Sequence, residues 1–203
     1  MRDGPRSERV LARGRIKVDA RRAVAKLREH LLVDLHLYAQ ELARAAHACG
    51  ARVLRVRYDA DDVVLAWDGV PVPASDLATL FDHLLGGAAG ETASLRSLAL
   101  GANAALGLSP RWVDLYTRPG PGRAHRVRWT PSLIADPDGD RPEAKLVEAP
   151  EGMPARGTAV HVRRSAGLET ALRAVGRGVP REIALLVAAI AELPFGVDRK
   201  SVV

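Results

Sequence analysis

The chain has 203 residues, of which 47% are hydrophobic and 27% charged, a composition typical of globular proteins and unlike that of disordered ones. No apolar run reaches the ~18 residues of a membrane-spanning helix, no secretory signal sequence is recognisable, and the single cysteine, Cys49, excludes an internal disulfide. We therefore expect a cytoplasmic protein with no membrane partner.

The net charge of +6 is unevenly distributed along the chain. Residues 1–28 hold ten Lys and Arg residues and three Asp and Glu residues. The remaining residues hold 20 Lys and Arg residues and 21 Asp and Glu residues. A basic N-terminal arm, residues 1–18, is therefore expected ahead of a nearly neutral domain. Such an arm is read either as a contact for nucleic acid or an acidic partner, or as a solvated tail. The solvated tail is favoured, because no aromatic residue is interleaved with the charges.

The first half of the chain reads as helices around a strand pair. A short amphipathic helix from about residue 20 precedes a longer one over 34–49, with Asp34 as its N-cap and Gly50 as its end. Two strands, 52–58 and 62–67, then form a hairpin across an acidic turn. Ser75 is expected to cap a helix that reaches residue 85. The Gly-rich stretch 86–94 that follows resists regular structure and allows movement.

The second half is expected to alternate between strands and helices. We expect a helix over 95–106, strands over 112–117, 124–129, 143–148 and 158–163, and helices over 168–176 and 180–193. Residues 130–141 read as a turn, because Pro137 and a missing terminal Glu exclude a calcium loop. Residues 198–203 read as a tail, with a truncation end as one explanation. Together these elements predict an α+β two-layer sandwich, with helices on one face of a mixed, mostly antiparallel sheet.

Three stretches resemble the GHKL (Bergerat-fold) ATPases, the superfamily of MutL, heat-shock protein 90, type II topoisomerases and histidine-kinase ATP domains. ELARAAHACGARVLRV (41–56) is similar to the first MutL-type motif, and LALGANAALGLSPRWVDLYT (98–117) to a later heat-shock-type motif. RGTAVHVRR (156–164) resembles the late Gly-Thr strand of the family. The resemblance implies a Bergerat-type ATP-binding domain over residues 19–197. It implies in addition that residues 86–94 form a movable lid, for which an ordinary surface loop is the alternative interpretation.

The resemblance also implies roles for particular residues. Glu41 matches the general base that activates water, but Ala45 stands where an Asn would hold Mg²⁺, so no metal ligand is expected and hydrolysis of ATP would be weak or absent. Asp68 and Gly69 match the adenine-binding turn, with Thr158 supporting the Asp and Gly101 lining the nucleotide. Strict spacing instead puts Trp67 in the Asp position. ATP or ADP is the implied cofactor.

Each of these residues also has an ordinary structural interpretation. Glu41 beside Arg44 fits an ion-paired surface carboxylate, Gly101 fits close helix packing, and Asp68 fits turn chemistry. The six histidines show no metal-ligand spacing. Three functions stay open: an ATP-binding conformational module of chaperone type, a pseudo-ATPase interaction domain that binds no nucleotide, and, less favoured, a nucleic-acid module using the basic arm. Protein partners or a homodimer accompany the first two.

Overall fold

The computed structural model describes residues 23–24, 26–27, 33–85, 93–136, 140–165 and 179–189, and the backbone of residues 196–201. The expected lid, most of the basic arm and the helix expected over 168–176 lie outside these residues, apart from residues 93 and 94 at the end of the lid stretch. Within the described part, no helix is long and apolar enough to cross a bilayer.

The strands form one seven-stranded sheet, in the order β5-β4-β3-β6-β2-β1-β7. All neighbouring strands are antiparallel except β1 and β7, which run parallel. The strands are β1 (Val53–Tyr58), β2 (Asp62–Trp67), β3 (Trp112–Arg118), β4 (Ala124–Trp129), β5 (Lys145–Val147), β6 (Gly157–Arg163) and β7 (Gly196–Ser201).

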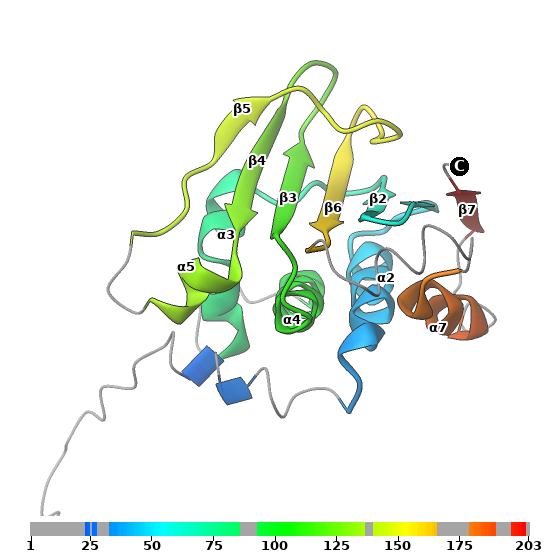
Figure 1. Cartoon of the computed structure of the whole chain (residues 1–203). Helices are drawn as coiled ribbons and strands as arrows, with labels where there is room; N and C mark the ends of the chain where they lie inside the picture. The colour runs from blue at the N-terminus through cyan, green and yellow to red at the C-terminus, as the bar shows by residue number, and fades with distance from the viewer. Residues whose placement is uncertain are drawn as a thin grey trace, which may run out of the picture.

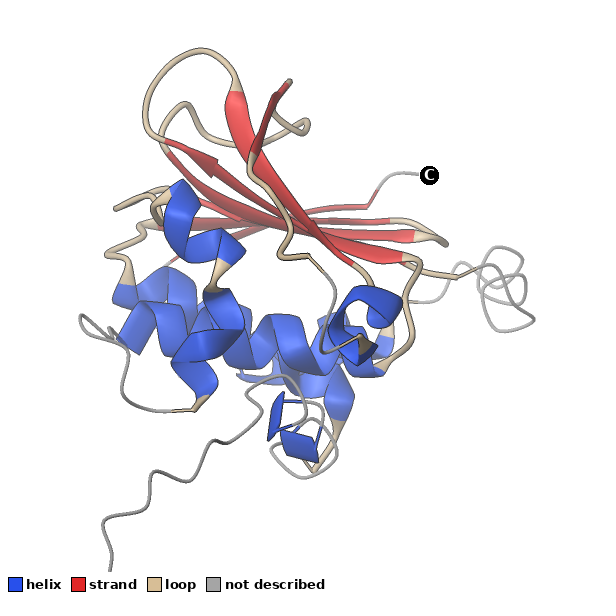
Figure 2. Cartoon of the chain, turned by 90° about the vertical axis from the view of Figure 1, so that its left-hand side faces the viewer, coloured by secondary structure: helices blue, strands red, loops and turns tan. Residues whose placement is uncertain are grey.

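The helices all lie against one face of this sheet, which gives the two layers visible in Figure 2. They are η1 (Leu35–Leu37), α2 (Tyr38–Ala48), α3 (Ala74–Ala78), η2 (Leu80–Leu84), α4 (Ala93–Gly107), α5 (Pro131–Ala135) and α7 (Arg181–Ala189). In Figure 1, α4 and α2 lie side by side beneath the strands, with α7 beyond α2. The predicted α+β two-layer arrangement with a mixed, mostly antiparallel sheet is therefore confirmed.

Alternation along the strands explains the core. Every second side chain of β1, β2, β3 and β6 is buried toward the helices, as in Leu54, Val56 and Leu65. The residues between them point to the opposite face of the sheet, which we call the outer face. Apolar side chains of α2 and α4 cover the core from the helical side.

Three expectations about local structure are wrong. Ser75 caps no helix, because α3 begins one residue earlier, after Pro73, and gives way to the 3-10 helix η2 at Thr79. Residues 130–141 contain the short helix α5, whose first turn is capped by Thr130: its Oγ1 accepts the Leu133 amide hydrogen at 3.1 Å. Of the residues assigned to a tail, 198–201 pair instead as part of β7 with β1, at the edge of the sheet.

Candidate functional site

The residues expected to form a nucleotide site lie on four elements that meet around α2. Glu41 is on α2, Asp68 and Gly69 follow β2, Gly101 is in the middle of α4, and Thr158 is on β6. Asp68 and Gly69 lie against the C-terminal end of α2, and Gly101 packs against its first turns. The contacts of each residue decide what it can contribute chemically.

Glu41 lies on the buried side of α2, only 6% exposed. Its carboxylate is ion-paired with Arg44, whose side chain is largely exposed one turn later on the same helix. The guanidinium compensates part of the hydration that the buried carboxylate loses. Ala45, where the resemblance would place a metal ligand, is buried and offers only a methyl group. Among the described residues, no group of three potential metal ligands is found.

Asp68 is engaged by the backbone at the start of β1. One carboxylate oxygen accepts the amide hydrogens of Arg52 at 2.8 Å and Val53 at 3.0 Å. Burial alone would raise the pKa of Asp68, but these two hydrogen bonds and the nearby Arg52 guanidinium outweigh it and hold the pKa below its usual value. The carboxylate therefore fixes the entry of the chain into β1.

Gly69 brings the same turn onto the end of α2. Its φ of +104° lies in the region that favours glycine, and a Cβ there would meet the carbonyl oxygen of Cys49 at 2.5 Å. The same carbonyl accepts the Val70 amide hydrogen at 2.9 Å. The Asp68-Gly69 sequence is thus required for the close packing of two chain segments.

Trp67 occupies the strand end at which the strict spacing places an adenine-binding Asp. It is 1% exposed, and its register partner on β6 is Thr158. The Thr158 hydroxyl accepts the buried Val72 amide hydrogen at 3.2 Å, while the Trp67 Nε1 has no hydrogen-bond partner in the described structure. Sequence reasoning noted the position of Trp67 but not that its indole would be enclosed.

Cys49 lies beside this indole. Burial raises the pKa of the Cys49 thiol, while the nearby polar groups of Trp67 and Ser94 act in the opposite direction. A thiol with a raised pKa is mostly protonated at neutral pH, so it is a weak nucleophile. We therefore regard Cys49 as part of the packing around Trp67.

Gly101 makes room for α2. A Cβ at this position would lie 2.9 Å from Leu42 Cδ2 and 3.0 Å from the carbonyl oxygen of Tyr38. The absence of a side chain therefore lets α2 and α4 approach closely. Helix packing, one of the two interpretations open from the sequence, accounts for this glycine.

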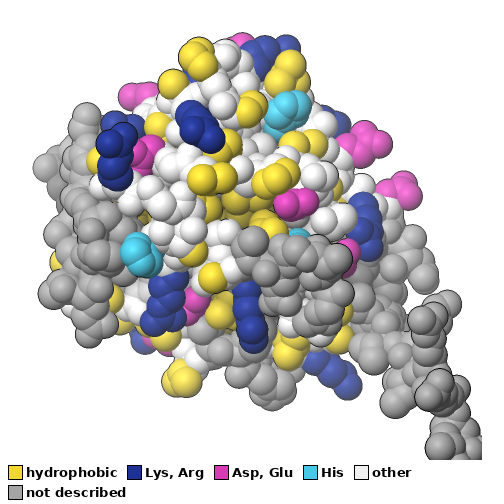
Figure 3. Space-filling view, turned by 180° about the vertical axis from the view of Figure 1, so that it is seen from behind, with side chains coloured by type: hydrophobic (Ala, Val, Ile, Leu, Met, Phe, Trp, Pro, Cys, Tyr) yellow, Lys and Arg dark blue, Asp and Glu magenta, His cyan; other side chains and the backbone are white. Residues whose placement is uncertain are grey.

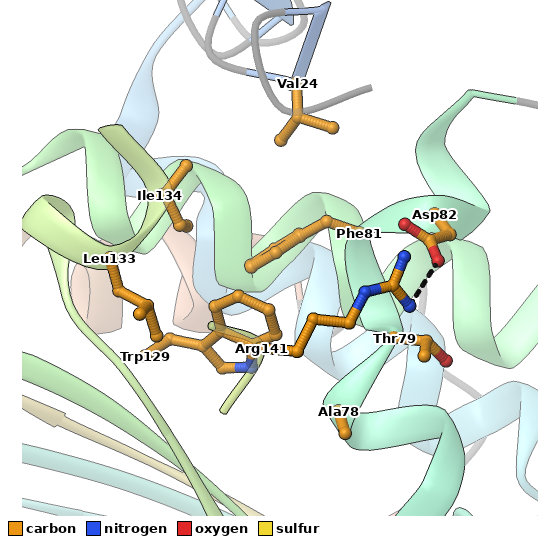
Figure 4. A pocket seen from close by; sticks show the side chains of 9 residues that line it. All are labelled: Val24, Ala78, Thr79, Phe81, Asp82, Trp129, Leu133, Ile134 and Arg141. Atoms are coloured by element: carbon orange, nitrogen blue, oxygen red, sulfur yellow. Dashed lines mark ion pairs between the residues drawn. The ribbon is translucent and has the colours of Figure 1, made fainter. Parts of the chain in front are cut away.

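Two hollows in the described structure lie elsewhere. One, of about 60 Å³, is lined by Phe81 and Trp129, whose ring centroids are 4.6 Å apart, and by the Asp82–Arg141 ion pair (Figure 4). This volume is well below the ~150 Å³ of a cavity that holds benzene. The second, of about 350 Å³, is on the outer face and is lined by His161, Tyr116 and Arg57 among others. Neither is lined by Glu41, Asp68, Gly101 or Thr158.

Sequence reasoning missed a cluster of charged side chains on the outer face. Asp114 is buried beneath Arg128 and Arg126, and Asp62 pairs with His161 at 2.7 Å and with Arg163. The signal was present as polar residues at every second position of β3, β4 and β6. This pattern can be recognised as a cluster only once the strands are known to be neighbours in the sheet.

Comparison with protein-family models finds no match to this chain, and comparison with curated proteins finds none either.

Proposed function

We propose that this chain is a GHKL-type domain that serves as an interaction and conformational module and fills its former nucleotide pocket with its own side chains. The observation that carries this proposal is the enclosure of Trp67 opposite Thr158, at the strand end that the resemblance assigns to adenine. The order of β2 beside β6 supports the resemblance, since it brings the late Thr next to that strand end.

The use of the other motif residues points the same way. Asp68 is engaged by two backbone amides, Gly101 accommodates Leu42, and Ala45 offers no ligand for Mg²⁺. A site that binds ATP needs these groups to face the ligand. Here these groups stabilise the packing of α2 against β2 and α4. We infer that the fold serves to present a surface of defined shape and not to bind ATP.

An ATP-binding module with little or no hydrolysis is the second candidate. The observation that favours it is Glu41, whose carboxylate lies on the buried side of α2. A carboxylate that served only in a surface ion pair would not need to be buried. A buried carboxylate, oriented by an arginine, is the kind of group that activates water when a substrate is nearby.

Calorimetric titration of the whole chain with ATP and with ADP, each with and without Mg²⁺, separates the candidates. The interaction module predicts no heat of binding at millimolar nucleotide. Micromolar binding that is insensitive to Mg²⁺ would instead establish the second candidate. A Glu41→Gln variant provides the control, because it changes turnover only if ATP is bound and hydrolysed.

A further inference from the structure

The strands of the outer face carry more cations than anions. The registers place seven Lys and Arg side chains and only two carboxylates on this side of β1 to β6. The chain as a whole holds 30 basic and 24 acidic residues, so the excess on this face is a segregation of charge. The cations are Arg55, Arg57, Arg118, Arg126, Arg128, Lys145 and Arg163, and the anions are Asp62 and Asp114. The adjoining loops add Asp61, which pairs with Arg163, and Glu151, which pairs with Arg57.

One end of this face is covered by the segment 148–154. Met153 packs against Ala66, Tyr116 and Ala159, and backbone carbonyls of the segment accept hydrogen bonds from Arg55, Arg57 and Arg118. Three of the seven cations therefore hold this segment. The remaining four lie on the open part of the face: Arg128 and Arg163 flank the Trp112 ring, and Arg126 and Lys145 lie beyond Arg128 on β4 and β5. We call this set, Trp112, Arg126, Arg128, Lys145 and Arg163, the cationic patch.

Buried Asp114 orients two arginines of the cationic patch. Its carboxylate is 0% exposed, receives two hydrogen bonds of 2.7 Å from Arg128, and lies 3.7 Å from Arg126. A guanidinium has five N–H donors, so each arginine retains donors for a further anion. The Arg128 side chain is 40% exposed. Asp114 thus orients the two guanidinium groups from the buried side, and their outer side is accessible to solvent.

Trp112 and the Arg128 guanidinium over its ring form a flat pair within the same patch. The Arg128 guanidinium lies 4.2 Å from the Trp112 ring centroid, and the His161 ring meets the Trp112 ring edge to face at 4.7 Å. Aromatic rings and guanidinium planes are the groups on which unpaired bases stack. No large exposed aliphatic side chain belongs to the described part of this face.

We propose that the cationic patch binds single-stranded nucleic acid, with phosphates on its arginines and lysine and a base stacked at Trp112. The basic residues 1–28 are excluded as the occupant, because like charges repel. The view from behind shows acidic and basic side chains interspersed with hydrophobic ones (Figure 3). This inference is independent of the nucleotide pocket and of the proposed function.

The test is fluorescence anisotropy of a labelled oligothymidylate titrated with the full chain at several salt concentrations. Lys145 is exposed and makes no ion pair within the described structure, so Lys145→Glu should leave the fold intact. It should weaken binding about fivefold and reduce the slope of log affinity against log salt by about 0.7. Trp112→Ala should weaken binding about tenfold, while Trp112→Phe should restore most of it.

The matched control is Arg96→Glu, the same charge change at an exposed residue of α4 in the helical layer. It should alter affinity by less than about twofold. Quenching of tryptophan fluorescence on binding, absent from Trp112→Phe, would place a base at the ring. The proposal is overturned by no binding at low salt, by equal losses in Arg96→Glu and Lys145→Glu, or by polyglutamate competing as well as the oligonucleotide.

Discussion

Trp67 on β2 and Thr158 on β6 are direct partners across the sheet, and both are buried. The indole fills the space at the strand end, while the Thr158 hydroxyl accepts the amide hydrogen of Val72 at 3.2 Å. The loop that leaves β2 is thereby tied back to β6. The strand end is closed by groups of the protein itself.

Thr158→Val should destabilise the protein because it removes this acceptor without changing side-chain volume. The buried Val72 amide would then have no partner, at a cost of about 1–3 kcal/mol. We would measure it by urea unfolding of both proteins. Thr79→Val is the control, since the Thr79 hydroxyl donates to a carbonyl at an exposed position. Equal effects of the two substitutions would show that the Val72 contact contributes little.

Gly69→Ala should lower stability by about 1–3 kcal/mol, because the residue has a φ of +104° and its Cβ would meet the Cys49 carbonyl oxygen. For a chain of this size, each kcal/mol lowers the melting temperature by about 2–4 °C. Gly120→Ala is the matched control, with nothing within 4 Å of its Cβ. A melting temperature of Gly69→Ala as high as that of the control would contradict the packing described for the turn.

Asp68 should make stability depend on pH in the acidic range. Because its folded pKa is lowered, its contribution is present above the unfolded pKa of about 3.9 and is lost as pH falls through the folded pKa. Asp68→Asn should therefore be less stable than the parent at neutral pH, by about 1 kcal/mol. The two unfolding curves should converge in strong acid. A difference that persists unchanged at low pH would exclude a role for the charge.

Arg164→Ala should be the most damaging of these substitutions. Glu182 on α7 is buried, where it is ion-paired with Arg164 and accepts a hydrogen bond from the Tyr38 hydroxyl at 3.2 Å. Removing the arginine leaves a buried carboxylate uncompensated, at about 3–5 kcal/mol. The neighbouring Arg181–Asp34 pair is far more exposed, and Arg181→Ala should cost under about 1 kcal/mol. Thermal unfolding of both variants checks the ranking.

The sheet and its helical cover could be predicted because they follow from local patterns. Alternation of apolar residues located β1, β2, β3, β4 and β6, and the caps at Asp34 and Gly50 delimited the first long helical segment. Asp34 accepts the His36 amide hydrogen at 2.9 Å, and Gly50 has a φ of +70°. These signals act within a few residues of the chain, so the sequence alone is sufficient to read them.

The missed elements have weak local signals. α5 has five residues, too few to show a helical period, although Thr130 and Pro131 are a legible N-terminal signal. β7 has the sequence GVDRKS, which lacks apolar alternation, and it is a strand only because β1 presents it with an open edge. Both depend on neighbours that the local sequence does not specify.

The candidate site depends even more on distant contacts. The partners of Asp68 are amides 15 and 16 residues earlier in the chain, and the closeness of Leu42 to Gly101 depends on how two helices meet. A motif match records residue types and spacing. It does not record whether each side chain faces a ligand or another part of the protein.

The parallel pairing of β7 with β1 bears on how the chain is made. β1 begins at residue 53, but its second neighbour is supplied only by residues 196–201. During synthesis, one edge of β1 therefore stays without its partner until about 140 further residues have been added. Unpaired strand edges recruit other chains, so a nascent polypeptide of this protein would be most prone to aggregation before β7 emerges from the ribosome.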